Sequence, residues 1–233
     1  MKKKLFSVFL MCAVSAMLFS GCGYKYKNED WTDKIDTYFD GLRSNASGMK
    51  NIDRAHREAF DSVFNNIEIF GARLCVPMKV SELPDKFELS DSWPEYIPLS
   101  EEEPNEIELD GGLKRYSLKL YYDREVCAAG VSVICKENQS IEEGIIYKIE
   151  LGALYFQPIL FGGKIEERSD IDEIKEFLGE GNEFYDVIYS ESEYCTLFYT
   201  DGNRIIELTY SIKGDDINFL LGAVRTYNSY GSI

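Results

Sequence analysis

The segment YCTLFYTDGNRIIELTYS, residues 194–211, decides the fold class. Its two ends, residues 194–200 and 204–211, are rich in aromatic and β-branched side chains, which favour strands. Between them stands Asp201-Gly202, a strong signal for the turn of a β-hairpin. The segment therefore predicts two antiparallel strands joined by a tight turn.

Further strands are predicted on both sides of this hairpin. Four more runs have strand composition, and they cover residues 116–122, 126–135, 145–151 and 219–227. A helix is predicted over residues 171–178, with Asp170 and Glu173 as a capping box and Gly179 as its end. Apolar residues at helical spacing predict a second helix over residues 52–65.

An internal repeat connects these elements. Residues 69–73 (IFGAR) precede a helix-like stretch at 80–87 and then strands, and residues 160–164 (LFGGK) precede the helix at 171–178 and the hairpin. We therefore expect an α+β fold of duplicated helix-plus-antiparallel-sheet units. The first unit covers 51–157 and carries an acidic insertion, and the second covers 158–233.

The first residues have the form of an export signal. Lys2, Lys3 and Lys4 precede the apolar run 5–19, which ends in Ser20-Gly21-Cys22. This run is shorter than the roughly 20 apolar residues of a membrane-spanning helix, and its basic start and small-residue end are typical of a cleaved signal. Ordinary secretory cleavage and an uncleaved anchor are the alternatives.

The residues around Cys22 resemble the bacterial lipobox, in which a lipid is attached to the cysteine before cleavage. This resemblance implies a signal peptide at 1–21, a lipid such as palmitate on Cys22, and a tether at 22–50 that leads to the folded body. The predicted location is the extracytoplasmic face of the cell membrane, with the Cys22 lipid as the membrane contact.

The charge of the chain excludes some partners. Removal of three lysines with the signal changes the formal net charge from −16 to −19. Nucleic acids and anionic lipid headgroups attract clustered Lys and Arg, so neither is expected to bind the protein surface.

Four cysteines remain outside the signal and the lipid site: Cys75, Cys127, Cys135 and Cys195. They could form two disulfides whose connectivity the sequence does not give, but small buried apolar residues are the favoured interpretation. In one unbroken strand, Cys127 and Cys135 would share a core face.

The lipobox, the strand, glycine and helix that open each half, and the tyrosine-rich hairpin that closes it together resemble cell-envelope lipoproteins of Gram-positive bacteria. Those lipoproteins look like tandem versions of the beta-lactamase-inhibitor-protein fold, in which helices pack on an antiparallel sheet. The resemblance covers residues 67–227. It implies an α+β body whose sheet surface grips a partner, and it brings no catalytic residues.

The sequence favours a protein that is not an enzyme. It has one histidine, His56, which could pair with Cys75 as a nucleophile, but the common hydrolase and nucleotide-binding motifs are absent. No cofactor is expected. The acidic run 101–110 is interpreted as a solvated loop without a metal, with a calcium site or a surface for a cationic partner as alternatives.

Three aromatic residues are the candidate contacts with a partner: Tyr121, Tyr199 and Trp93. The two tyrosines are expected on outward faces of strands, and Trp93 lies beside Pro94 in a loop-like stretch. The leading hypothesis is a lipoprotein that binds an unidentified envelope protein. The alternatives are a solute-binding lipoprotein and, less favoured, a cysteine-dependent enzyme.

Overall fold

The computed structural model describes residues 49–101, 104–109, 112–152, 159–166, 169–187, 193–213 and 216–226, all within one compact unit, Arg43–Ile233. The predicted signal peptide, Cys22, nearly all of the predicted tether and the boundary at 157/158 lie outside these residues. No helix among the described residues is long and apolar enough to cross a membrane.

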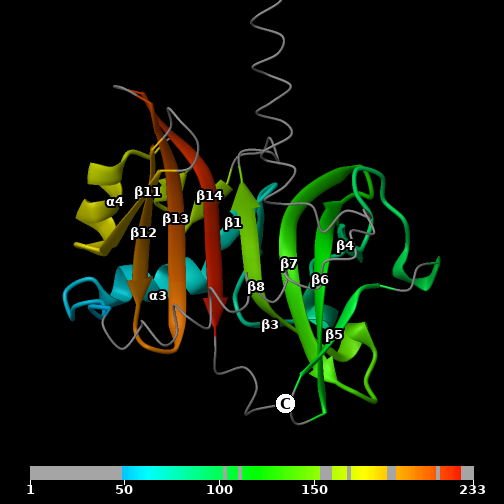
Figure 1. The fold of residues 1–233 in the computed structure, drawn as a ribbon. Helices are drawn as coiled ribbons and strands as arrows, with labels where there is room; N and C mark the ends of the chain where they lie inside the picture. The colour runs from blue at the N-terminus through cyan, green and yellow to red at the C-terminus, as the bar shows by residue number, and fades with distance from the viewer. Residues whose placement is uncertain are drawn as a thin grey trace, which may run out of the picture. The chain divides into compact units, whose positions relative to one another are not determined.

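A ten-stranded antiparallel sheet forms most of the body (Figure 1). Its main strand order is β11-β12-β13-β14-β8-β7-β6-β4, with β3 paired to β8 and β5 paired to β6. The strands are β3 (Met78–Lys79), β4 (Phe87–Ser90), β5 (Glu106–Leu109), β6 (Leu113–Tyr122), β7 (Val126–Lys136), β8 (Ile145–Gly152), β11 (Asn182–Val187), β12 (Glu193–Thr200), β13 (Arg204–Lys213) and β14 (Asp216–Thr226).

Two pairings between distant parts of the chain unite the fold. In the large sheet, β14 pairs with β8, from Leu221 opposite Gly152 to Arg225 opposite Lys148. In a small four-stranded sheet, the hairpin of β1 (Ile67–Ile69) and β2 (Ala72–Leu74) meets that of β9 (Ile159–Phe161) and β10 (Ile165–Glu166) through β1 and β9. The large sheet thus consists of two equivalent sets of four strands, β4-β6-β7-β8 and β11-β12-β13-β14, which meet where β8 pairs with β14.

The predicted α+β class with duplicated helical units is wrong, because the body is mainly β. The described residues contain two α-helices, α3 (Arg57–Asn65) and α4 (Ile171–Leu178), and three 3-10 turns, η2 (Val80–Glu82), η3 (Leu99–Glu101) and η4 (Ile141–Glu143). Both α-helices lie on the β11–β14 half of the sheet (Figure 1). The strand order therefore recurs, whereas the helix does not.

The stretch at residues 80–87 explains this difference. It forms only the turn η2, after which Leu83 is extended, with ψ 136°. Pro84 disfavours helical conformation at the preceding residue and has no N–H to donate. The stretch therefore leads directly into the strand β4 instead of forming a helix.

Most other local predictions agree with the structure, but residues 106–109 of the acidic run, expected as a loop, form the strand β5. All six predicted strands are present, with ends displaced by three residues or fewer. The helix α4 has the expected bounds, with the Asp170 carboxylate accepting from the Glu173 amide and Gly179 at φ +80°. The helix α3 begins at Arg57 rather than at residue 52, because the Asp53 carboxylate accepts the His56 backbone N–H and holds a turn there.

A β-bulge makes the expected placement of Cys127 wrong. Cys127 lies opposite Tyr121 and Ala129 opposite Leu120, so Ala128 is an extra residue in β7. Since directly opposed side chains share a face, Cys127 shares that of Tyr121, while Cys135 belongs to the core. All four cysteines are free thiols, with Cys135 and Cys195 buried.

The two small hairpins provide a matched test of packing against α3. Gly71 and Gly162 both have positive φ, where a side chain costs about 1–2 kcal/mol. A Cβ at Gly71 would meet nothing within 4 Å, whereas one at Gly162 would lie 2.6 Å from the Ser62 Oγ in α3.

We therefore expect Gly162→Ala to lower the free energy of unfolding by at least about 1 kcal/mol more than Gly71→Ala, because overpacking adds to the backbone strain. Denaturant unfolding of the two variants measures this difference. Equal losses of stability would show that the contact between α3 and the second hairpin is not tight.

Candidate functional site

Neither candidate tyrosine is exposed to solvent, and the expected outward placement is wrong for Tyr199. Tyr121 is 0% exposed and Tyr199 is 2% exposed. Tyr199 belongs to the main core and stands against Gly181, where an added Cβ would lie 2.9 Å from its ring. Its hydroxyl makes no hydrogen bond among the described residues, and burial raises the pKa of Tyr199. Neither tyrosine can serve as a surface anchor in this conformation.

Tyr121 does lie on the sheet face opposite the core, as its position in the strand implies, but a loop of the same chain covers it. The Tyr121 hydroxyl donates to the Ser92 carbonyl over 3.0 Å. The ring of Tyr96 stands against it edge to face, with 5.5 Å between ring centroids. The segment after β4 thus packs on Tyr121.

This segment, residues 91–97, is referred to below as the Trp93 loop. The hydroxyl of Ser90, which is fully buried, donates to the Ile97 carbonyl over 2.8 Å and accepts from the Ser92 and Ile97 amides. One side chain therefore holds both ends of the loop together. Farther along the chain, Asn105 donates its amide and side-chain N–H groups to the Asp91 carboxylate.

A second set of contacts fixes the underside of the loop. The Tyr96 hydroxyl donates to Glu88 over 2.5 Å, and Arg124 donates to the same carboxylate over 2.7 Å while its guanidinium stands over the Tyr96 ring. The hydrogen bonds from Arg124 and Tyr96 lower the pKa of Glu88. Burial and the bond to Glu88 raise the pKa of Tyr96 to about 12, so the phenol remains a donor at neutral pH.

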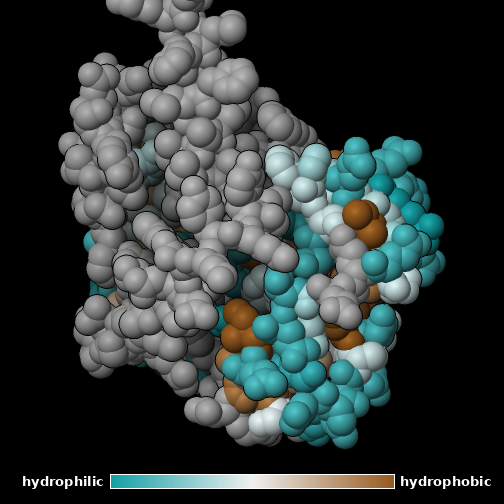
Figure 2. Space-filling view, turned by 45° about the vertical axis from the view of Figure 1, so that its right-hand side comes forward, coloured by the Kyte–Doolittle hydropathy of each residue, from teal (hydrophilic) through white to brown (hydrophobic). Residues whose placement is uncertain are grey.

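The tip of the loop is exposed above this support. Trp93, Pro94 and Glu95 are consecutive exposed residues, and the Trp93 side chain is 51% exposed. Among the side chains whose exposure the structure describes, only those of Trp93 and Val126 are large, hydrophobic and exposed. The coloured part of the surface in Figure 2 is mostly hydrophilic, with hydrophobic residues in small separate areas. The Trp93 loop is therefore the best candidate for a binding surface.

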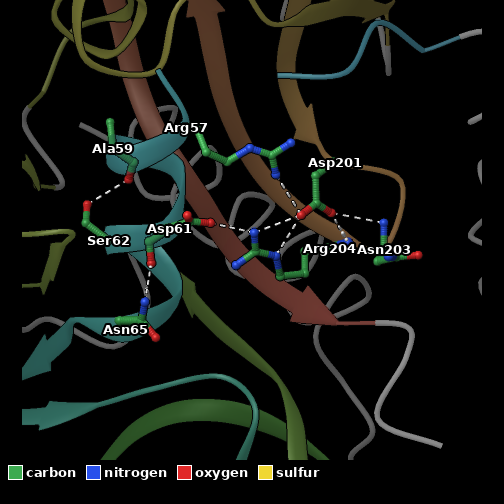
Figure 3. A network of polar contacts seen from close by, with 8 residues as sticks. All are labelled: Arg57, Ala59, Asp61, Ser62, Asn65, Asp201, Asn203 and Arg204. Atoms are coloured by element: carbon green, nitrogen blue, oxygen red, sulfur yellow. Dashed lines mark hydrogen bonds and ion pairs between the residues drawn. The ribbon is translucent and has the colours of Figure 1, made fainter. Parts of the chain in front are cut away.

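The densest polar cluster lies elsewhere and has a structural role (Figure 3). Arg204, which follows the turn between β12 and β13, donates to Asp201 over 2.8 and 2.9 Å and to Asp61 of α3 over 2.5 Å. Its guanidinium lies 5.0 and 4.8 Å from the ring centroids of Phe60 and Phe64. This cluster fixes α3 on the hairpin.

Asp201 is the least exposed acid in the cluster, with an 11% exposed side chain, and it also accepts from Arg57 over 3.0 Å. Burial would raise the pKa of Asp201, but hydrogen bonds from Arg204 and from the Asn203 amide outweigh it and lower the pKa. Each charged group is paired with a neighbour, which is the arrangement of an ion-pair network that stabilises a fold rather than of a reactive centre.

The structure does not bring the nucleophile candidates together. His56 Nδ1 lies 2.8 Å from the Asp53 carboxylate, whereas the Cys75 thiol contacts the Pro77 carbonyl. Burial and then Glu82 raise the pKa of Cys75, the opposite of what activates a thiol. Across the described ranges no group of three or more His, Cys, Asp or Glu residues could hold a metal ion.

A groove beside β3 is small. It is lined by Pro77, Met78, Lys79, Glu82 and Ile145 and has a volume of about 150 Å³. Pockets for small molecules usually measure roughly 300–1,000 Å³, so this groove does not favour solute binding.

The Trp93 loop was only partly predictable. The sequence indicates Trp93 as an exposed anchor, but it does not indicate the contacts that hold the loop. Ser90 and Tyr96 lie close to Trp93 in the sequence. The only local signals for their contacts are the alternation in β4 and the mixture of polar and aromatic residues in the loop. Tyr121 comes from β6 and Arg124 from the turn after it, and neither leaves a local signal. Comparisons with protein-family models, curated proteins and solved structures give no match.

The Asp201 cluster gives a prediction on pH. Because the folded-state pKa of Asp201 is lowered, its contribution to stability is complete above the unfolded value of about 3.9 and is lost as the pH falls through the folded value. Wild-type protein should therefore lose more stability than Asp201→Asn on acidification below about pH 4. Denaturant unfolding between pH 2 and pH 6 measures this loss, with the exposed Asp172→Asn as the control that keeps the wild-type slope.

At neutral pH, Arg204→Ala should lower the free energy of unfolding by about 2 kcal/mol, because it leaves the nearly buried Asp201 without its main donor. Arg57→Ala removes a 44% exposed side chain and should cost less than about 1 kcal/mol. Equal effects of the two substitutions would contradict the central place of Arg204.

Proposed function

We propose that this chain is a membrane-anchored envelope lipoprotein without catalytic activity, which binds another protein through the Trp93 loop. The observation that carries the proposal is a half-exposed tryptophan at the tip of a loop whose base is fixed. The lipobox-like sequence around Cys22 supplies the proposed anchor, and its lipid holds the acidic body at the extracytoplasmic face of the membrane.

The energetics of the loop support binding. Tryptophan is among the residues that contribute most to protein interfaces, because it buries a large area on contact. Binding usually also costs conformational entropy when a loop becomes ordered. Ser90, Tyr121 and Tyr96 already hold the Trp93 loop, so the part of this cost due to its backbone is small.

The exposure of Trp93 differs from that of its aromatic neighbours. The neighbouring aromatic residues show how the chain buries such side chains, since Tyr121 is fully buried and Tyr96 packs against it. An indole that is 51% exposed gains only part of the hydrophobic stabilisation that full burial by a partner would give. This contrast favours Trp93 over Tyr121 and Tyr199 as the partner contact.

The anchor has a test of its own. Cys22→Ser should abolish acyl labelling in the cells of the host and should leave unprocessed precursor or release soluble protein, because the lipid acceptor is lost. Metabolic labelling with a clickable fatty acid, followed by membrane fractionation, measures both results. Absence of label in the wild type, together with unchanged membrane retention of the variant, would refute the lipid anchor.

The binding surface is tested by photocrosslinking in living host cells. We expect p-benzoylphenylalanine at position 93 to capture one dominant protein, and the same group at Glu176, an exposed residue of α4, to capture none. In affinity pull-downs, Trp93→Ala should lose this partner and Trp93→Phe should keep part of the binding, because an aromatic ring remains. Capture at Glu176 alone, or none at position 93, would refute the proposed surface.

A further inference from the structure

The Trp93 loop belongs to a segment of one charge sign. Between Lys86 and Lys114 the sequence contains nine Asp and Glu residues and no Lys, Arg or His. This stretch of the chain is therefore strongly acidic, and unscreened charges attract cations within about the 8 Å Debye length of physiological ionic strength.

Some of these carboxylates are neutralised by ion pairs within the fold, whereas others are not. Glu88 is paired with Arg124, and Glu106 is paired with Lys114 over 3.0 Å. Both pairs use a lysine or arginine from outside the acidic segment. These two acids thus have a cationic partner within the fold.

Two exposed acids of the segment differ from these. Glu95 is exposed at the tip of the Trp93 loop, and Glu101 is exposed at the end of η3. Neither forms an ion pair with any of the described residues. The charge of Glu101 contributes to the raised pKa of Tyr96, so Glu101 lies in the neighbourhood of the Trp93 loop.

The contact between Asn105 and Asp91 brings the two parts of the acidic segment together. Both hydrogen bonds from Asn105 reach one carboxylate oxygen of Asp91, at 3.2 and 3.4 Å. The chain after Glu101 therefore returns to the base of the Trp93 loop. Asn105, which follows the acidic run, thus lies beside the first residue of the Trp93 loop.

We infer that the Trp93 loop binds a segment of a partner protein that carries lysine or arginine. This inference rests on the proposed function and specifies the chemistry of the partner. A cation can stand over the face of the Trp93 indole, which is the strongest aromatic platform for such a contact. Glu95 and Glu101 supply the opposite charges, and their role is to orient and accelerate encounter. A second copy of this chain is disfavoured, because both surfaces would be acidic.

The test compares charge variants in the same photocrosslinking assay. With p-benzoylphenylalanine at position 93, Glu95→Lys combined with Glu101→Lys should reduce capture about tenfold or more, and Glu95→Gln with Glu101→Gln should reduce it less. The matched control is Glu142→Lys with Glu176→Lys, which makes the same change in net charge at exposed sites on η4 and α4 and should leave capture unchanged. Thermal unfolding verifies that all variants remain folded.

Mass spectrometry of the crosslinked peptide identifies the captured segment, which should contain clustered Lys or Arg. A synthetic copy of it can then be titrated against full-length Trp31→Phe, in which Trp93 is the sole tryptophan. We expect a change in Trp93 fluorescence and weaker binding as sodium chloride rises from 0.05 to 0.5 M, because salt screens the charges (roughly 14 to 4 Å Debye length).

The outcomes separate the two proposals. Capture of a protein segment that is neutral or acidic, or capture that charge reversal does not change, overturns the cationic partner and leaves the proposed function standing. Capture of a second copy of this chain also overturns it. No protein captured from position 93, or capture of a cell-wall polymer or lipid instead, overturns the proposed function itself.

Discussion

The antiparallel pairing of β8 with β14 is the interaction on which the rest of the structure depends. It joins residues that are 69 to 77 positions apart and converts two four-stranded arrangements into one sheet. Without it, each arrangement would expose a long unpaired edge, which is an aggregation hazard. The pairing of β1 with β9 repeats this connection in the small sheet. The position of α3 on the β11–β14 half, fixed by Arg204, adds a third link between the two parts of the chain.

Local signals in the sequence predicted local structure well. The Asp201-Gly202 turn, the six strands and the capped helix α4 each depend on residues within a few positions of one another. Predictions failed where a single residue changed the backbone. Pro84 prevented a helix after η2, and the extra residue Ala128 moved Cys127 to the other face of the sheet.

Predictions of exposure failed for a different reason. Alternation along β6 correctly places Tyr121 on the face away from the core, but burial depends on what covers that face. Here the cover is the Trp93 loop, which is held by Ser90 and by contacts from Arg124, 36 positions after Glu88. The sequence could therefore indicate Trp93 as a candidate, whereas the support that makes it a credible binding site required the fold.

The place of β14 in the sheet has a consequence for the order in which the structure can form. It is the last strand along the described chain, yet it lies in the interior of the strand order, between β13 and β8. A chain that emerges from the ribosome or from a translocation channel N-terminus first cannot complete the large sheet until this strand arrives. The body is therefore built to fold late and as a whole. A chain shortened before β14 would lose the centre of its sheet rather than a dispensable margin.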